Sequence, residues 1–181
     1  RWLANHELEV IKRVASLVEA LYNSGRFAET CWCLSAYYGS SFSFFEALAL
    51  HDTCEQWGRD WNSYAALVIS LVNTCCHGML PLVMDCLRWD WCCKGRLHRY
   101  PSALKSVYMK EARRTGYNYL MSKSVRGIIT PDGVSFSKEE LRRSIFFVPE
   151  SREFSSRVMK GDLAIFLPDK SKSSMRSIPS S

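Results

Sequence analysis

Eight cysteines are the residues of this sequence whose chemistry could be most distinctive. They are Cys31, Cys33, Cys54, Cys75, Cys76, Cys86, Cys92 and Cys93. A structural zinc site usually takes two ligands from one turn, as in Cys-x2-4-Cys, and neighbouring cysteines on a helix point about 100° apart. Cys31-x-Cys33, Cys75-Cys76-His77 and Cys86 with Cys92-Cys93 and His98 do not fit this spacing. We therefore expect mainly reduced thiols packed in a core, with metal ligation and disulfides as the weaker alternatives.

The histidines and paired acids do not form a recognisable catalytic constellation. His6, His51, His77 and His98 have no Ser or Cys nearby in a known nucleophile setting, so we expect surface or capping residues. Asp85 and Asp90 lie five residues apart on a predicted helix, where they share a face poorly, so paired-carboxylate catalysis is not expected. The sequence predicts no catalytic residue, no cofactor-binding residue and no metal ligand.

A basic segment from residue 94 to residue 126 is the main candidate binding surface. It contains nine Lys and Arg residues against one acid, Glu111. Nucleic acid, an acidic partner domain or water alone could face such a segment, and the last two are favoured. If it binds RNA, Trp91 or Tyr100 would stack on bases. The expected phosphate contacts are then Lys94, Arg96, Arg99, Arg113 and Arg114.

Hydrophobic periodicity and helix-boundary residues predict a mainly α fold, a bundle of about six helices followed by a small strand-rich appendix. Gly25 and Gly39 are expected to end the first two helices, and Ser43 with Glu46 to form a capping box for the third. Asp60 or Asn62 would cap the fourth. The expected helices span residues 8–22, 27–38, 44–57, 62–75, 82–93 and 101–115.

After Gly116 the sequence pattern changes from that of long helices to that of short strands and turns. We expect a hairpin around Pro131-Asp132-Gly133, and then a helical turn capped by Ser137 with Glu140. Strands are expected at residues 144–148 and 162–167. The predicted organisation is a helical domain over residues 1–120, a small α+β appendix over residues 121–168 and a disordered tail over residues 169–181.

Length and hydropathy set further bounds. At 181 residues the chain can bury one sizeable core. It begins at Arg1, which suggests a piece of a longer protein. No signal peptide and no membrane-spanning run is apparent, so a cytoplasmic location is expected.

Three segments read in order, YNSGRF, SFSFFEALA and LRWDW followed by KGRLHRYPSALK, carry a family resemblance. Together they resemble a domain of unknown function at the C-terminus of cobalamin-binding radical SAM proteins, over about residues 2–167. Cys31-Trp32-Cys33 and Cys92-Cys93 depart from what that resemblance leads us to expect. The matching residues are Tyr22, Asn23, Ser24, Gly25, Arg26, Phe27, Phe42, Phe44, Phe45, Glu46, Asp90, Gly95, Arg96 and Pro101.

The resemblance implies that the chemistry lies upstream of Arg1. The parent would use a four-iron, four-sulfur cluster, S-adenosylmethionine and cobalamin, and the Cys-x3-Cys-x2-Cys signature of the cluster is absent from this chain. The expected function is an accessory domain that packs on the upstream radical SAM and cobalamin-binding domains or gates substrate. Its interface would include the Tyr22–Phe27 turn and long aromatic side chains. The alternative is an RNA- or tRNA-binding module that uses residues 94–126, and no membrane partner is expected.

Overall fold

The computed structural model describes residues 4–52, 60–94, 101–105, 110, 113–114, 116–118, 128–129, 135–136, 145–159 and 164–166. The chain forms two compact units, Arg1–Asp90 and Trp91–Ser181, and their boundary falls within one helix. The prediction of a mainly α fold is confirmed. The predicted division at residue 120 stays a prediction.

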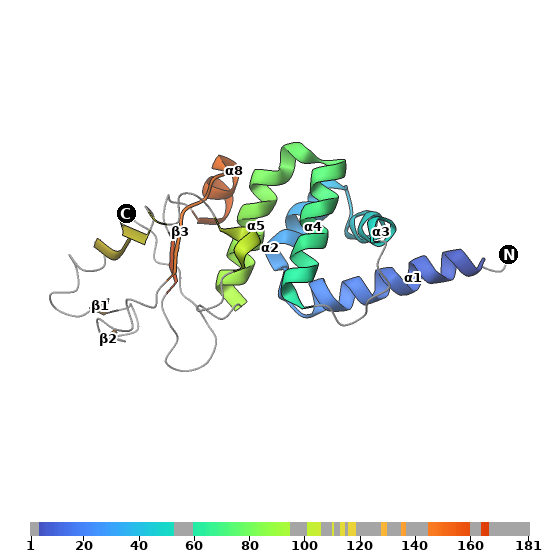
Figure 1. Ribbon diagram of the computed structural model, residues 1–181, viewed down its shortest axis with the longest axis horizontal. Helices are drawn as coiled ribbons and strands as arrows, with labels where there is room; N and C mark the ends of the chain where they lie inside the picture. The colour runs from blue at the N-terminus through green and yellow to red at the C-terminus, as the bar shows by residue number, and fades with distance from the viewer. Residues whose placement is uncertain are drawn as a thin grey trace. The chain divides into compact units, whose positions relative to one another are not determined.

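The described residues of the first unit form α1 to α4 and most of α5 (Figure 1). Helix α1 continues into a π-helical turn, η1, and a 3-10 turn, η2, leads directly into α5, which runs opposite to α4 (Figure 1). The first five predicted helices are therefore present in the predicted order, whereas the sixth, expected over residues 101–115, is not formed at its start, where Ser102–Leu104 is a 3-10 turn and Lys105 lies outside any helix. The bounds are α1 Asn5–Leu17, η1 Val18–Asn23, α2 Ala28–Tyr37, α3 Ser41–His51, α4 Trp61–Cys75, η2 His77–Met79 and α5 Leu80–Lys94.

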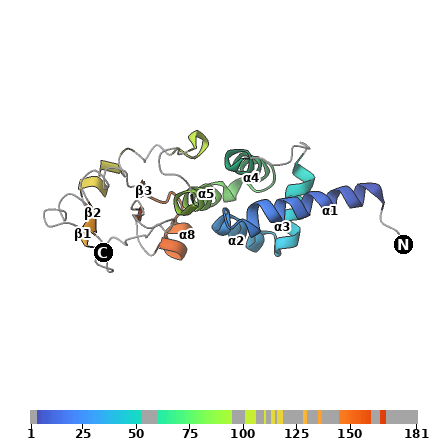
Figure 2. The same ribbon diagram turned by 90° about the horizontal axis from the view of Figure 1, so that it is seen from below.

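Helix α3 holds the first unit together. It crosses α1 and also packs against α2 and α4 (Figure 2). Its core residues include Phe44 and Leu48, which are completely buried, and each of the helices α2, α4 and α5 contributes further buried side chains. Burying such apolar side chains is the main favourable term for the fold.

The predicted helix boundaries are partly confirmed. Gly25 and Gly39 adopt left-handed φ angles of 62° and 78° after the first two helices, as expected. Asp60, not Asn62, caps α4: its Oδ1 accepts hydrogen bonds from the Ser63 backbone N–H at 2.9 Å and from the Ser63 Oγ at 2.7 Å. Pro81 lies in the first turn of α5, where a missing N–H costs nothing.

Two expectations about α3 are wrong. The Ser43–Glu46 capping box is not formed, because the helix begins earlier and Ser40 is the cap, with its Oγ accepting from the Ser43 backbone N–H at 3.0 Å. The helix also ends at His51 and not near residue 57, because Asp52 is extended and its carbonyl accepts a hydrogen bond from Arg13 at 3.1 Å. Residues 53–59 lie outside the described part of the chain.

The described parts of the second unit are shorter. Strand β1, Ile128–Ile129, pairs antiparallel with β2, Ser135–Phe136, and β3, Ile145–Phe147, pairs antiparallel with β4, Ala164–Phe166. A 3-10 turn, η3, spans Ser102–Leu104, and an α-helical turn, α8, spans Arg152–Phe154 before the π-helical turn η5, Ser155–Met159. The Phe147 and Phe154 rings meet at 5.5 Å in the core of this unit.

The strand-rich appendix stays a prediction, because most of residues 121–168 lie outside the described part. The Pro131-Asp132-Gly133 turn, the Ser137–Glu140 turn and the tail over residues 169–181 lie outside it as well. Among the described helices, none has the length and apolar character needed to span a membrane.

The two turn glycines Gly39 and Gly78 provide a matched test of this backbone description. A Cβ at either position would meet no atom within 4 Å, but only Gly39 has a left-handed φ. We expect Gly39→Ala to lower the free energy of unfolding by about 1 kcal/mol, because L-residues are strained there. Gly78→Ala should leave it unchanged or raise it by about 0.5 kcal/mol, since it reduces the entropy of the unfolded chain. Urea denaturation measures both, and equal losses would contradict the assigned turn.

Candidate functional site

The Tyr22–Phe27 turn links α1 to α2 through local hydrogen bonds. The Ser24 hydroxyl donates to the Ala20 carbonyl at 2.6 Å and accepts from the Arg26 backbone N–H at 3.2 Å. Asn23 donates to the Glu19 carboxylate at 2.6 Å. These contacts, together with the left-handed Gly25, stop one helix and redirect the chain into the next.

Within this turn, the two aromatic residues differ in exposure. Tyr22 is 61% exposed, whereas Phe27 is completely buried. The Phe27 ring stacks on Trp61 with centroids 5.0 Å apart and contacts Tyr64 edge-on at 6.4 Å. Phe27 therefore anchors the turn to α4 within the core of the first unit.

Asp90 closes the start of α2 from a distant part of the sequence. Phe27, at the N-cap position, gives no side-chain cap. Instead, Asp90 Oδ1 accepts from the Glu29 backbone N–H at 3.0 Å, and Asp90 Oδ2 accepts from the Thr30 backbone N–H at 2.9 Å and from the Thr30 hydroxyl at 2.7 Å. The first N–H groups of a helix have no partner within the helix, so α5 supplies the cap that α2 lacks.

The burial of this cap changes its acid–base properties. Burial raises the pKa of the Asp90 carboxyl to about 7, while the hydrogen bonds from Thr30 and Glu29 lower it and so offset part of the rise. Burial, with a smaller contribution from the Asp90 charge, also raises the pKa of the Cys31 thiol to about 12. Cys31 is therefore a neutral thiol at physiological pH and not an activated nucleophile.

A second buried polar contact lies one turn earlier on α5. The Arg88 Nη1 donates to the Asp85 Oδ1 at 3.0 Å, and both side chains are almost completely buried. Buried charges need partners, and these two side chains partner each other. Asp85 and Asp90 therefore have separate partners and do not form an acid–base pair.

The expected interface aromatics divide into core and surface residues. Phe44 and Phe45 are buried and contact each other with centroids 4.8 Å apart, whereas Phe42 is 64% exposed and Glu46 is exposed. Trp32 and Tyr37 on α2 are 56% and 51% exposed. We call Trp32, Tyr37 and Phe42 the aromatic surface; Tyr37 and Phe42 flank the turn at Gly39, whereas Trp32 lies five residues before Tyr37 and so on another side of α2.

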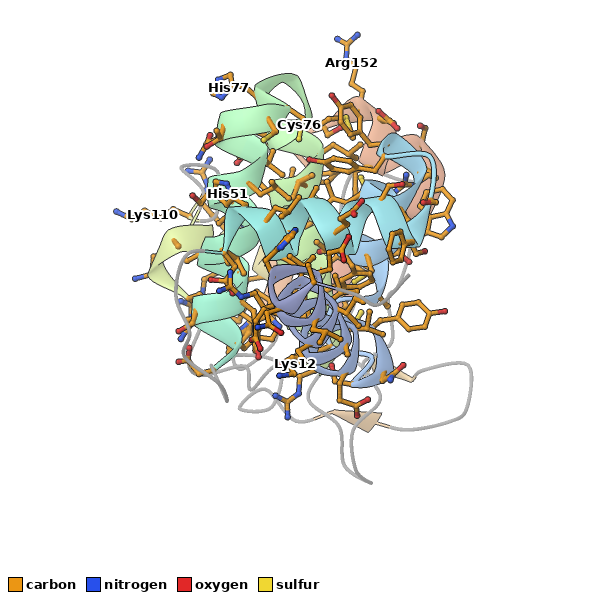
Figure 3. The ribbon with its side chains drawn as sticks, turned by 90° about the vertical axis from the view of Figure 1, so that its right-hand side faces the viewer. Lys12, His51, Cys76, His77, Lys110 and Arg152 are labelled. Atoms are coloured by element: carbon orange, nitrogen blue, oxygen red, sulfur yellow. The ribbon has the colours of Figure 1, made fainter. Side chains whose placement is uncertain are left out.

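The described part of the basic segment forms a second candidate surface. Lys110, Arg113, Arg114 and Tyr117 line an open hollow of about 450 Å³ in the second unit, and we call these four residues the basic hollow. Its three cations are exposed, and Figure 3 shows the Lys110 side chain extending away from its helix. Arg113 and Arg114 were predicted phosphate contacts. The Lys94 side chain and residues Gly95, Arg96, Arg99 and Tyr100 lie outside the described part, while Pro101 is buried.

Lys110 and Tyr117 are the residues that the sequence reasoning missed. Lys110 lies three and four residues before Arg113 and Arg114 in the expected helix over residues 101–115, so its place beside them was available in the sequence, whereas Tyr117 lies beyond the expected end of that helix. The Asp90 cap had no comparable signal, because its partners lie 60 and 61 residues away.

The cysteines match the expectation of core thiols at five of the described positions. Cys31, Cys33, Cys76, Cys86 and Cys92 are buried, Cys75 is exposed, and none of the seven described cysteines is in a disulfide. The His77 ring points away from the protein beside Cys76 (Figure 3). The described residues contain no group of three or more His, Cys, Asp or Glu arranged to hold a metal ion. Cys54 lies outside them.

The described features define a helical domain with one buried cap, one aromatic surface and one basic hollow. The chain belongs to the protein family of unknown function DUF4080, whose model matches residues 1–158. No curated protein and no solved structure is significantly similar to it.

Two carboxylates with opposite burial allow the Asp90 cap to be tested. Asp90→Asn keeps one acceptor oxygen but directs an amide N–H at a backbone donor of α2, which leaves a buried N–H without a partner. We expect a loss of about 1 to 3 kcal/mol in the free energy of unfolding at pH 5. Asp60→Asn is the control: Asn caps an exposed helix as well as Asp does, so its loss should be about 0.5 kcal/mol or less. Urea denaturation of both variants decides, and similar losses would contradict the buried cap.

The same two variants should differ in their pH dependence. The folded-state pKa of Asp90, about 7, lies above its ordinary value of 3.8, so the folded protein binds the extra proton between these values. The contribution of Asp90 is therefore complete below about pH 4 and is lost as pH rises through 7, at no more than about 1.4 kcal/mol per pH unit. The stability gap between wild type and Asp90→Asn should narrow from pH 5 to pH 8.

Asp60 gives the opposite expectation. Hydrogen bonds from the Ser63 side chain and backbone lower the pKa of Asp60. Its contribution is thus present above its unfolded pKa and is lost as pH falls through the folded value. The gap between wild type and Asp60→Asn should shrink only under acid conditions. A gap for Asp90→Asn that widens between pH 5 and pH 8 would show that Asp90 has no raised pKa.

Proposed function

We propose that this chain is the C-terminal accessory domain of a cobalamin-binding radical SAM enzyme and that it packs on the catalytic barrel through the aromatic surface. The observation that carries the proposal is the exposure of three large aromatic side chains, Trp32, Tyr37 and Phe42, on two neighbouring helices. Aromatic residues are enriched among the residues that carry most of the binding energy of protein interfaces.

The Tyr37 side chain is supported by other rings. Tyr37 contacts Tyr38 edge-on with ring centroids 5.4 Å apart, and Tyr38 contacts the buried Phe44 at 6.1 Å. The rings therefore form a continuous path from the surface to the core, across the turn at Gly39 that joins α2 to α3. A side chain held in this way loses little conformational entropy on binding, which favours docking.

In the proposed parent enzyme, the catalytic residues lie upstream of Arg1. The cluster, S-adenosylmethionine and cobalamin would be bound there, and the described residues of this chain offer no metal-binding group of three or more ligands. The role proposed for this chain is to cover the barrel or shape substrate access. The proposed accessory domain includes residues 121–168 as a small α+β appendix.

The motif order supports the parent assignment. The Tyr22–Phe27 turn, the Phe-Phe-Glu helix and the Asp90 segment occur in the sequence in the order that the resemblance implies. Two of these segments meet in the structure at the start of α2, because the turn leads into that helix and Asp90 caps it. The resembled segments thus include the contacts that position the aromatic surface.

The experiment begins by reading the coding sequence upstream of Arg1 and expressing the encoded barrel without this domain. Tyr37→Ser/Phe42→Ser should weaken binding of the purified chain to that barrel at least tenfold, because the variant removes exposed apolar anchors and leaves the core intact. Calorimetry measures the affinity. Leu50→Ser, at an equally exposed apolar residue elsewhere on α3, is the control and should bind as wild type.

Two results would overturn the proposal. One is an upstream sequence without a Cys-x3-Cys-x2-Cys barrel. The other is an affinity that the Tyr37/Phe42 variant and the Leu50 variant change equally.

A further inference from the structure

The basic hollow is a surface that the docking proposal does not use. Lys110, Arg113, Arg114 and Tyr117 line a single open space of about 450 Å³, within the size range of small-molecule sites. The first three are exposed and Tyr117 is partly buried. Each of the four has helical backbone, and in the sequence they follow i, i+3, i+4, i+7 spacing.

The charges of the basic hollow are of one sign. Cations three and four residues apart on a helix repel one another, and none of the described lining residues is acidic. The hollow therefore has a positive potential that an anion would relieve. In the sequence, the 94–126 segment as a whole has one acid, Glu111, against nine Lys and Arg residues.

The side-chain types narrow the kind of anion. Two neighbouring guanidinium groups offer planar donor pairs that match phosphate oxygens, and the Lys110 ammonium adds a point charge that suits a multiply charged group. Tyr117 adds an aromatic face to the same hollow, and a nucleotide base can stack on such a face. An inorganic anion or a simple carboxylate would leave the aromatic face without a role.

We propose that the basic hollow binds a nucleotide unit, with its phosphate held by Lys110, Arg113 and Arg114 and its base stacked on Tyr117. The unit is either a free nucleotide or part of a single RNA strand, because both present the same phosphate and base. The proposal is independent of the docking function and of the parent enzyme.

Three probes test the proposal on the 181-residue chain: AMP, oligouridylate and inorganic phosphate, titrated by calorimetry at two salt concentrations. We expect AMP or oligouridylate to bind at least tenfold more tightly than inorganic phosphate, with affinity falling as salt rises. Oligouridylate binding at least tenfold more tightly than AMP identifies an RNA strand as the ligand, and comparable affinities identify a free nucleotide. No binding, or equal affinity for phosphate and AMP, would overturn the nucleotide assignment.

The variants locate the binding. Arg113→Glu/Arg114→Glu should weaken binding of the nucleotide probe at least tenfold, because it removes both guanidinium groups. Arg26→Glu/Arg152→Glu changes the net charge by the same amount at two other exposed arginines and should have less than a threefold effect. If both charge variants lost the same affinity for the nucleotide probe, net charge alone would explain the effect and the proposed site would be wrong.

Tyr117→Leu separates stacking from charge. It should weaken the nucleotide probe about fivefold or more and leave phosphate affinity unchanged. Unchanged melting temperatures identify variants that remain folded. If Tyr117→Leu weakened both probes equally, the base-stacking role would be wrong.

Discussion

The first unit depends on the buried Asp90 carboxyl, which caps α2 from α5. Two backbone N–H groups and one hydroxyl of Glu29 and Thr30 converge on its two oxygens. The contact fixes where α2 begins and so determines which of its residues face solvent. Phe27, just before the helix, can then insert against α4, while Trp32 and Tyr37 remain on the surface.

Capping a helix with a buried carboxyl is energetically costly. Removing its charge from water is unfavourable, and only good hydrogen bonds compensate. Thr30 is suited to the raised pKa of Asp90, because its hydroxyl can donate to the carboxylate and can accept a proton from the neutral acid. The contact therefore survives in both protonation states. Asp60 is the contrasting case, an exposed cap whose pKa is lowered by the hydrogen bonds from Ser63.

Local signals in the sequence predicted most of the helix boundaries. Gly39 and Pro81 act within one turn of themselves, so a single stretch of sequence is enough to place them. The capping box failed because Ser40 and Ser43 both satisfy the local rule, and the choice between them depends on where α3 begins. The role of Asp90 could not be read at all, since its partners are brought near only by folding. The three cations of the basic hollow could have been grouped from their spacing in the expected helix over residues 101–115, whereas Tyr117 lies beyond its expected end.

The structure thus separates residues that are buried in the fold from residues at the surface. Phe27, Phe44, Phe45 and Asp90 belong to the first group, while the aromatic surface and the cations of the basic hollow belong to the second. A carbon-13 NMR titration of the Asp90 carboxyl, recorded with the backbone amides of Glu29 and Thr30, tests the central contact most directly. The account predicts a carboxyl midpoint near pH 7, shared by both amides. A midpoint near 4, or amides that do not follow the carboxyl, would contradict it.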